Sequence, residues 1–96
     1  MSGVSAPPDP ATHAFRKDLA DAALAGQVIA SHYAEPLVRH ILIDSPLRDA
    51  PSDTAPVIAT VTIGDPFRML DASLGWAWGY ARSGRVGYVD LAAIGA

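Results

Sequence analysis

The chain contains no cysteine among its 96 residues. This absence excludes disulfide bonds, thiolate metal sites and a cysteine nucleophile within the chain. Basic residues are also few, with seven Lys and Arg against ten Asp and Glu and a formal net charge of −3. Because the sequence has no basic stripe, it does not favour nucleic acid or an anionic membrane surface as a partner.

Long apolar runs are missing as well. No stretch of the sequence approaches the roughly 18 consecutive apolar residues of a membrane span. Met1–Pro10 lack the charged and apolar regions of a signal peptide. A length of 96 residues suffices for one domain with a modest core. The sequence therefore predicts a single small domain without a membrane span.

Residues that could catalyse a reaction are scattered along the chain. The three histidines, His13, His32 and His40, lie in separate segments and lack the spacing of a zinc site. No serine stands in a Gly-x-Ser-x-Gly motif. We therefore predict no catalytic residue, no metal and no cofactor, and we expect that the chain is not an enzyme by itself.

Aromatic residues make up only 7% of the chain, but both tryptophans and two of the three tyrosines lie close together near the C-terminus. Side chains in a strand alternate between its two faces. Trp76, Trp78 and Tyr80 would therefore share one face, and the small Ala77 and Gly79 would share the other. The small face predicts close packing against another layer, and the aromatic face suggests a binding groove or a docking surface.

Residues 13–36 are predicted to form a short helix and a strand that pack on the rest of the domain. Asp18 is a good N-cap, an apolar stripe follows it, and Gly26 is a suitable stop. Val28–Ala30 is predicted to be a short strand. Residues 1–12 hold three prolines and are expected to be a disordered or extended lead-in.

Residues 37–96 alternate β-prone runs with turn residues. Ile41 and Ile43 are predicted to face the core, and Leu47–Pro56 reads as a long polar loop. Short strands and turns at this spacing predict a mainly β fold, a small five-stranded barrel with a short N-terminal helix. The predicted strands are Val38–Ile43, Val57–Ile63, Phe67–Leu70 and the two aromatic segments around Trp76–Tyr80 and Gly87–Val89.

Several segments resemble one known family. The stretch Leu47–Ile94 is similar to bacterial SH3 domains, and with the upstream segments the resemblance extends from about His13 to Gly95. The subgroup that it resembles is the N-terminal SH3 domain of NlpC-type cell-wall cysteine peptidases, often labelled dipeptidyl-peptidase-like. The similar motifs are Asp18–Asp21, Leu24–Val28, Leu47–Ser52, Gly64–Phe67, Gly75–Gly79 and Gly87–Val89.

The resemblance implies an SH3-like barrel with a non-catalytic role. Enzymes of this family carry a cysteine nucleophile and histidine partners in a catalytic domain after the SH3 domain, and this chain has no cysteine. We expect a domain excised from a larger enzyme, rather than a stand-alone relative, that helps to bind or position cell-wall peptide. The implied partners are the catalytic peptidase domain of the same parent protein and peptidoglycan-derived peptides.

The resemblance also implies a ligand groove beside the first tryptophan, near the long loop. Aromatic faces suit sugars and aliphatic stems, and carboxylates suit amino groups. For Asp71 a role as a turn residue is an alternative. The predicted ligand-binding residues are Trp76, Tyr88, Asp49, Asp53 and Asp71.

Three alternatives remain, the first for the rest of the aromatic face and the other two for the role of the whole domain. Trp78 and Tyr80 are expected either to be buried under the N-terminal helix or to dock on the catalytic domain. A purely structural domain, which stabilises the peptidase and has no ligand of its own, is the second alternative. The third is binding of proline-rich peptides, which requires groove aromatics in the first loop, and Leu47–Pro56 contains none.

Overall fold

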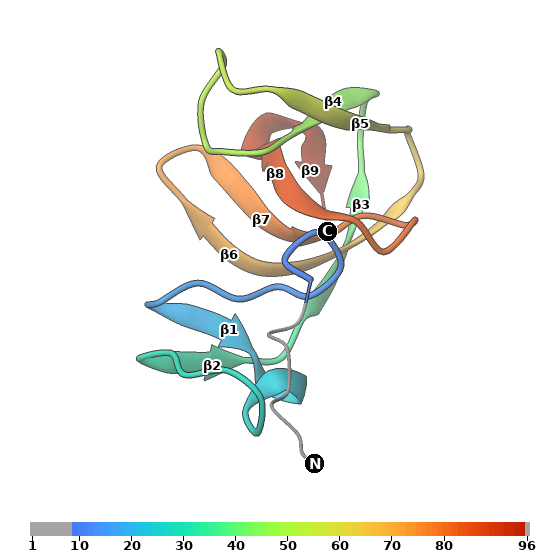
Figure 1. Cartoon of the computed structure of the whole chain (residues 1–96). Coiled ribbons are helices and arrows are strands. Elements are labelled where there is room, and N and C mark those ends of the chain that lie inside the picture. The colour runs from blue at the N-terminus through green and yellow to red at the C-terminus, as the bar shows by residue number, and fades with distance from the viewer. Residues whose placement is uncertain (1–8, 96) are drawn as a thin grey trace.

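The structure is a computed structural model that describes residues 9–95. The lead-in expected for residues 1–12 therefore lies mostly outside the described residues. Strands dominate the described part, in which a two-stranded sheet lies beside a seven-stranded sheet (Figure 1). The smaller sheet pairs β1 (Leu19–Asp21) with β2 (His32–Ala34) in parallel. The larger sheet contains β3 (Leu37–Ile41), β4 (Ser45–Arg48), β5 (Val57–Val61), β6 (Pro66–Ser73), β7 (Trp76–Tyr80), β8 (Val86–Asp90) and β9 (Ile94–Gly95).

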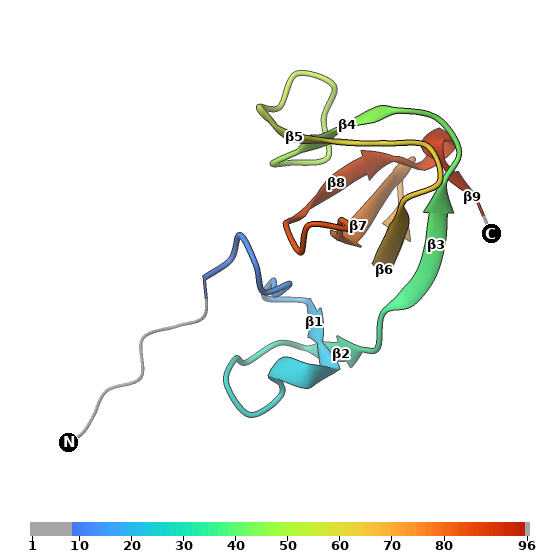
Figure 2. The same cartoon turned by 90° about the vertical axis from the view of Figure 1, so that its right-hand side faces the viewer.

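The larger sheet is curved but open. Its strand order is β5-β4-β8-β7-β6-β3-β9, with β5 and β9 at its two edges. Figure 2 shows how the sheet curls, with β3 and β9 near one another and β4 and β5 across the top. The mainly β architecture is consistent with an SH3-like fold. The closed five-stranded barrel predicted from the sequence is not formed, because β5 pairs with β4 alone and β9 with β3 alone.

The predicted N-terminal helix is wrong. The chain forms β1 there, followed by η1 (Ala22–Leu24), a single turn of 3₁₀ helix. An isolated helix of about two turns is marginal, and pairing of β1 with β2 offers a stronger alternative. Asp18 does not cap a helix, since its carboxylate binds Arg16, and Asp21 caps η1 by accepting a hydrogen bond from the backbone N–H of Ala23.

The predictions for the first two strands were also partly wrong. Val28–Ala30 is not a strand, and the second strand of the small sheet is β2 instead. Ile41 is buried as predicted, but Ile43 is 58% exposed. The reason is that β3 ends at Ile41, after which the chain turns and the backbone N–H of Leu42 bonds to Ala93. The alternation of faces does not continue through this turn.

The main core lies on the concave side of the large sheet. Phe67 and Leu47 are completely buried there. The same cluster includes a residue of η2 (Leu91–Ala93), a 3₁₀ turn capped by Asp90. Neither η1 nor η2, the helical segments of residues 9–95, has the length that a bilayer crossing requires. The buried members of the cluster are Ile41, Leu47, Val61, Phe67, Ala77, Ala81, Val89 and Ala93.

A second cluster covers the opposite face of β7 and β8. Trp78, Tyr80 and Val86 are buried there with Ala14 of the N-terminal segment. This segment, drawn in blue, passes beside the large sheet before it enters β1 (Figure 1). The alternation predicted for β7 is thereby confirmed, since Ala77 packs in the main core and Trp78 in the second cluster.

The small side chains of β7 allow its close packing. A Cβ placed on Gly79 would overlap the backbone carbonyl of Arg68 on β6, at an irregularity in the strand register between Met69 and Asp71. Only glycine fits at this position without a shift of the backbone. The β6–β7 pairing, and with it the direction of the aromatic side chains, depends on this contact.

Replacing Gly79 with Ala should lower the free energy of unfolding by about 3 kcal/mol, since the added methyl group meets rigid backbone. Urea denaturation followed by tryptophan fluorescence measures the effect. Gly26→Ala is the matched control, because a Cβ there meets no atom within 4 Å. Equal stability of the two variants would contradict this close approach.

Candidate functional site

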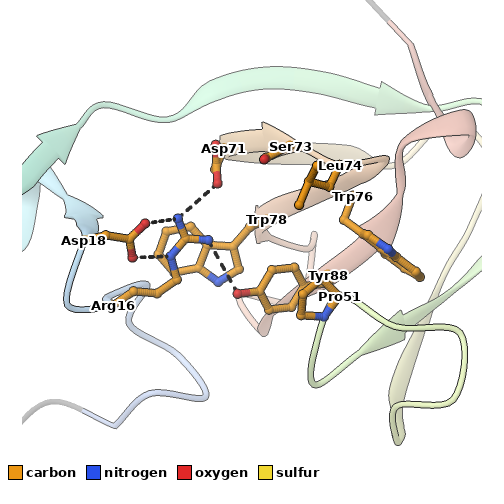
Figure 3. Close-up of a pocket in the computed structure, with 9 residues that line it drawn as sticks. All are labelled: Arg16, Asp18, Pro51, Asp71, Ser73, Leu74, Trp76, Trp78 and Tyr88. Atoms are coloured by element: carbon orange, nitrogen blue, oxygen red, sulfur yellow. Dashed lines mark hydrogen bonds and ion pairs between the residues drawn. The ribbon is translucent and has the colours of Figure 1, made fainter.

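A pocket of about 320 Å³ lies on the outer face of β7, between the β6–β7 hairpin, the N-terminal segment and the first long loop. Figure 3 shows the charged residues at one end and the apolar residues at the other. The pocket is lined by Arg16, Asp18, Pro51, Asp71, Ser73, Leu74, Trp76, Trp78 and Tyr88.

Arg16 organises the charged end. Its Nε and Nη2 donate to the two oxygens of Asp18 at 3.0 and 2.8 Å, and Nη2 also donates to Oδ2 of Asp71 at 3.0 Å. Its Nη1 lies 3.5 Å from the hydroxyl of Tyr88. One guanidinium thus joins the N-terminal segment to β6 and β8.

The guanidinium also lies over the ring of Trp78. Its central carbon is 4.3 Å from the centre of the Trp78 ring, within the range of a cation–π contact. Burial acts to lower the pKa of Arg16, but hydrogen bonds to Tyr88, Asp18 and Asp71 outweigh it and raise the pKa. In turn, the hydrogen bond from Arg16 lowers the pKa of Asp18. The arrangement therefore holds one cation between two carboxylates.

Aromatic and aliphatic side chains form the other end. Trp76 is partly buried at the start of β7, and Tyr88 is partly buried on β8. Tyr88 stands directly across from Trp78, with ring centroids 6.4 Å apart. Pro51 of the long loop and Leu74 of the β6–β7 turn complete this end (Figure 3). Such a surface suits an aliphatic group or the face of a sugar.

Three of the five predicted ligand-binding residues come together in this pocket. They are Trp76, Tyr88 and Asp71. Asp49 is exposed and instead lines a second cavity of about 190 Å³, which Phe15 and Tyr88 also line. Asp53 is exposed in the loop and is not among the lining residues of either space.

Trp78 and Tyr80, the residues expected to be buried or to dock, are only 3% and 5% exposed. Their cover is residues 14–21 of this same chain. The hydroxyl of Tyr80 accepts a hydrogen bond from the Ala14 N–H at 2.9 Å and donates to Oδ2 of Asp21 at 2.7 Å. The guanidinium carbon of Arg68 also lies over the Tyr80 ring, 4.5 Å from its centre. Docking of these rings on another domain would require displacement of this cover.

The Tyr80 hydroxyl is sensitive to its surroundings. Burial raises its pKa, and the hydrogen bond to and charge of Asp21 raise it further, against the opposing effect of the Ala14 N–H. The folded chain therefore favours the protonated tyrosine. This hydroxyl ties the N-terminal segment to the large sheet.

Sequence reasoning missed the residues that the N-terminal segment brings to the pocket, Arg16 and Asp18. Both stand in a segment that was interpreted as the approach to a helix. Their position follows from local backbone contacts, in which the Arg16 N–H bonds to Leu19 and the Asp21 N–H bonds to Ala14. The only signal in the sequence is a charged pair beside an apolar run, and that pattern is common in surface segments. Within residues 9–95 there is no cluster of three or more His, Asp or Glu placed to hold a metal ion.

Comparison with known families identifies the β core of this chain. A family model described as the bacterial dipeptidyl-peptidase SH3 domain matches residues 47–94, which is half of the 96 residues. The chain belongs to this family. No curated protein and no solved structure matches the chain. The SH3 family expected from the sequence is thereby confirmed.

Family membership has two consequences. An SH3 domain alone is non-catalytic, and this SH3 domain has no cysteine. An accessory domain of a peptidase also implies a catalytic domain as its partner in the parent protein. The matched residues supply Asp71, Trp76 and Tyr88 to the pocket, whereas Arg16 and Asp18 come from outside the match.

Replacing Tyr80 with Phe should lower the free energy of unfolding of this SH3 domain by about 1–3 kcal/mol, because the Ala14 N–H and the Asp21 carboxylate lose a partner in a buried place. Denaturation followed by tryptophan fluorescence measures this loss. Tyr33→Phe, at an exposed tyrosine in β2, is the control.

The wild type and Tyr80→Phe also test how the free energy of unfolding depends on pH. Because the pKa of Tyr80 is higher in the folded state, its contribution to stability is complete below the ordinary tyrosine pKa of about 10. It is lost as the pH rises through the folded-state pKa. The free energy of unfolding of the wild type should therefore fall more steeply above pH 10 than that of Tyr80→Phe. Identical slopes would show that folding does not raise the pKa of the Tyr80 hydroxyl.

Proposed function

We propose that this SH3 domain binds a peptide of the bacterial cell wall in the pocket around Asp71, Trp76 and Tyr88. The bound peptide would be held for a peptidase domain of the parent protein, of NlpC type by sequence resemblance. The observation that carries the proposal is the combination of a carboxylate and two aromatic side chains around one pocket.

The charges of the pocket favour a positively charged group. Arg16 contributes one positive charge, and Asp18 and Asp71 contribute two negative charges, so one negative charge remains. Arg16 binds Oδ2 of Asp71, and among the described residues Oδ1 of Asp71 has no hydrogen-bond partner. An ammonium group is a suitable partner for that oxygen. Peptide fragments with a free amino group supply one.

The aromatic residues favour the remainder of the peptide. Trp76 and Tyr88 offer ring faces, an indole N–H and a hydroxyl in the same pocket as the carboxylate, so an aliphatic chain can pack while polar groups retain partners. Such binding remote from the bond to be cleaved aids the reaction by positioning, because it converts binding energy into orientation of the substrate. The domain contributes no reacting group.

Asp71→Asn should weaken binding of a cell-wall peptide with a free amino group about tenfold, because a charged hydrogen bond becomes a neutral one. Titration followed by NMR chemical shifts or tryptophan fluorescence gives the dissociation constants. Asp53→Asn removes the same charge from the exposed loop and should have no effect. An N-acetylated peptide should bind the wild type as weakly as the free peptide binds Asp71→Asn.

The absence of any spectral change at millimolar peptide would refute direct binding by this domain. Equal losses for Asp71→Asn and Asp53→Asn would point to a general effect of charge and not to this pocket.

A structural role in docking the peptidase domain is the second candidate, and one surface feature favours it. Leu42, Ile43 and Ile63 are each more than half exposed. Their turns are joined by a hydrogen bond from the Ile63 N–H to Asp44 at 2.8 Å. Exposed apolar side chains held together in this way are typical of interfaces.

Under this second candidate, Ile63→Ser should weaken association with the separately produced catalytic domain of the parent protein about tenfold, because a buried apolar contact is lost. Analytical ultracentrifugation or calorimetry measures the association. Ile29→Ser, at an exposed apolar residue beside the small sheet, is the control. Unchanged association would exclude the Ile63 surface as the docking face, and the peptide titration should not respond to either variant.

A further inference from the structure

The turn between β6 and β7 has an unusual residue at its tip. Ser73 pairs with Trp76, so Leu74 and Gly75 alone form the turn. Both have positive φ angles, 53° for Leu74 and 83° for Gly75. Two successive positive φ angles are what a type I′ hairpin turn requires, and Asn, Asp or Gly ordinarily occupies the first position.

Leucine is poorly suited to this backbone conformation. Its Cβ crowds the following carbonyl oxygen in the left-handed region, and its side chain has no polar atom to compensate. Leu74 is the single non-glycine residue with positive φ between residues 9 and 95. Strained positions of this kind concentrate at functional sites.

Packing within the described residues does not explain the leucine either. Its side chain is 97% exposed, so it gains almost no burial in return for the strain. An asparagine at this position would tolerate the positive φ angle, and its polar side chain would be suited to full exposure to water. The residue thus opposes both the local backbone preference and the preference of apolar side chains for the interior.

The position of Leu74 suggests what it contacts. It lines the candidate pocket together with Trp76. In Figure 3 it lies beside Trp76 and away from Arg16 and Asp18. The two-residue turn fixes its place relative to Trp76, because Ser73 and Trp76 are held as a strand pair. A short, tightly closed turn therefore presents an aliphatic side chain at the apolar end of the pocket.

We propose that Leu74 is a specificity-determining contact that, together with Trp76, packs against an aliphatic side chain of the bound peptide. The inference rests on the proposed function and adds the chemical class of the peptide residue that the pocket recognises. The peptide would place its amino group at Asp71 and an aliphatic side chain, rather than a charged one, at Leu74. Binding removes from water a leucine that the free domain leaves exposed.

The test is to replace Leu74 with Asn and to measure stability and binding together. The variant should raise the midpoint of thermal unfolding by about 5 °C, because the strain is removed. It should weaken binding of a peptide with a free amino group and an aliphatic side chain by about tenfold. A rise in stability together with weaker binding shows that the binding is not lost through unfolding, and this combination is typical of a strained residue that serves a site.

Two further variants serve as controls. Leu74→Met keeps an apolar side chain and should bind the aliphatic peptide within about twofold of the wild type. Ile29→Asn removes an equally exposed apolar residue, 96% exposed and outside the pocket, and should not change binding. A peptide with glycine in place of the aliphatic residue should bind wild type and Leu74→Asn equally.

The outcomes separate the two proposals. If the wild type binds the peptide and Leu74→Asn binds it equally well, the role of Leu74 is refuted and the proposed function stands. If the wild type binds none of these peptides, the proposed function fails and this inference fails with it. Lower stability of Leu74→Asn, with binding lost in proportion, would show a structural role for the leucine and would also refute the inference.

Discussion

Strand β7 must be packed on both of its faces, and the rest of the structure depends on this constraint. On one face Ala77 is completely buried in the main core, and Gly79 permits the backbone of β6 to approach. On the other face Trp78 and Tyr80 present two large rings that the curved sheet cannot cover. The N-terminal segment supplies the missing cover, and the hydrogen bonds of the Tyr80 hydroxyl to Ala14 and Asp21 attach it. Apolar burial thus decides the path of a segment whose local preferences are weak.

The same cover builds the charged end of the pocket. Once Ala14 is fixed against β7, Arg16 has Trp78 beneath it and Asp71 within hydrogen-bond distance. The carboxylate of Asp71 is then oriented by a residue that lies outside the matched family region. The family core supplies the aromatic wall and one carboxylate, and the N-terminal segment determines the geometry in which that carboxylate is presented. Folding and site formation are therefore coupled through one short segment.

The parts of the fold that follow period-two alternation were predictable from the sequence. The opposite faces of β7 and the burial of Ile41 follow from this spacing. The formation of β1 in place of the predicted N-terminal helix was not predictable, because tertiary pairing decides the structure of so short an amphipathic segment. In the site, Trp76 and Tyr88 lie on adjacent paired strands, so their proximity could be predicted from the sequence. Arg16 was not, because its contact with Asp71 joins residues 55 positions apart.

The shared guanidinium also bears on the class of ligand that we propose for the pocket. Two carboxylates without it would carry two negative charges, a combination that attracts a divalent cation. Arg16 occupies the space between Asp18 and Asp71 and leaves one negative charge, beside an apolar wall. A doubly charged ion would have to displace Arg16 from Trp78. The hydrogen bonds of Arg16 to both carboxylates would then be lost. A singly charged ammonium group attached to an aliphatic chain needs no such displacement, because it can use the second oxygen of Asp71 and pack on Trp76. Under the proposed function, the charges and the apolar wall of the pocket therefore favour the same class of ligand.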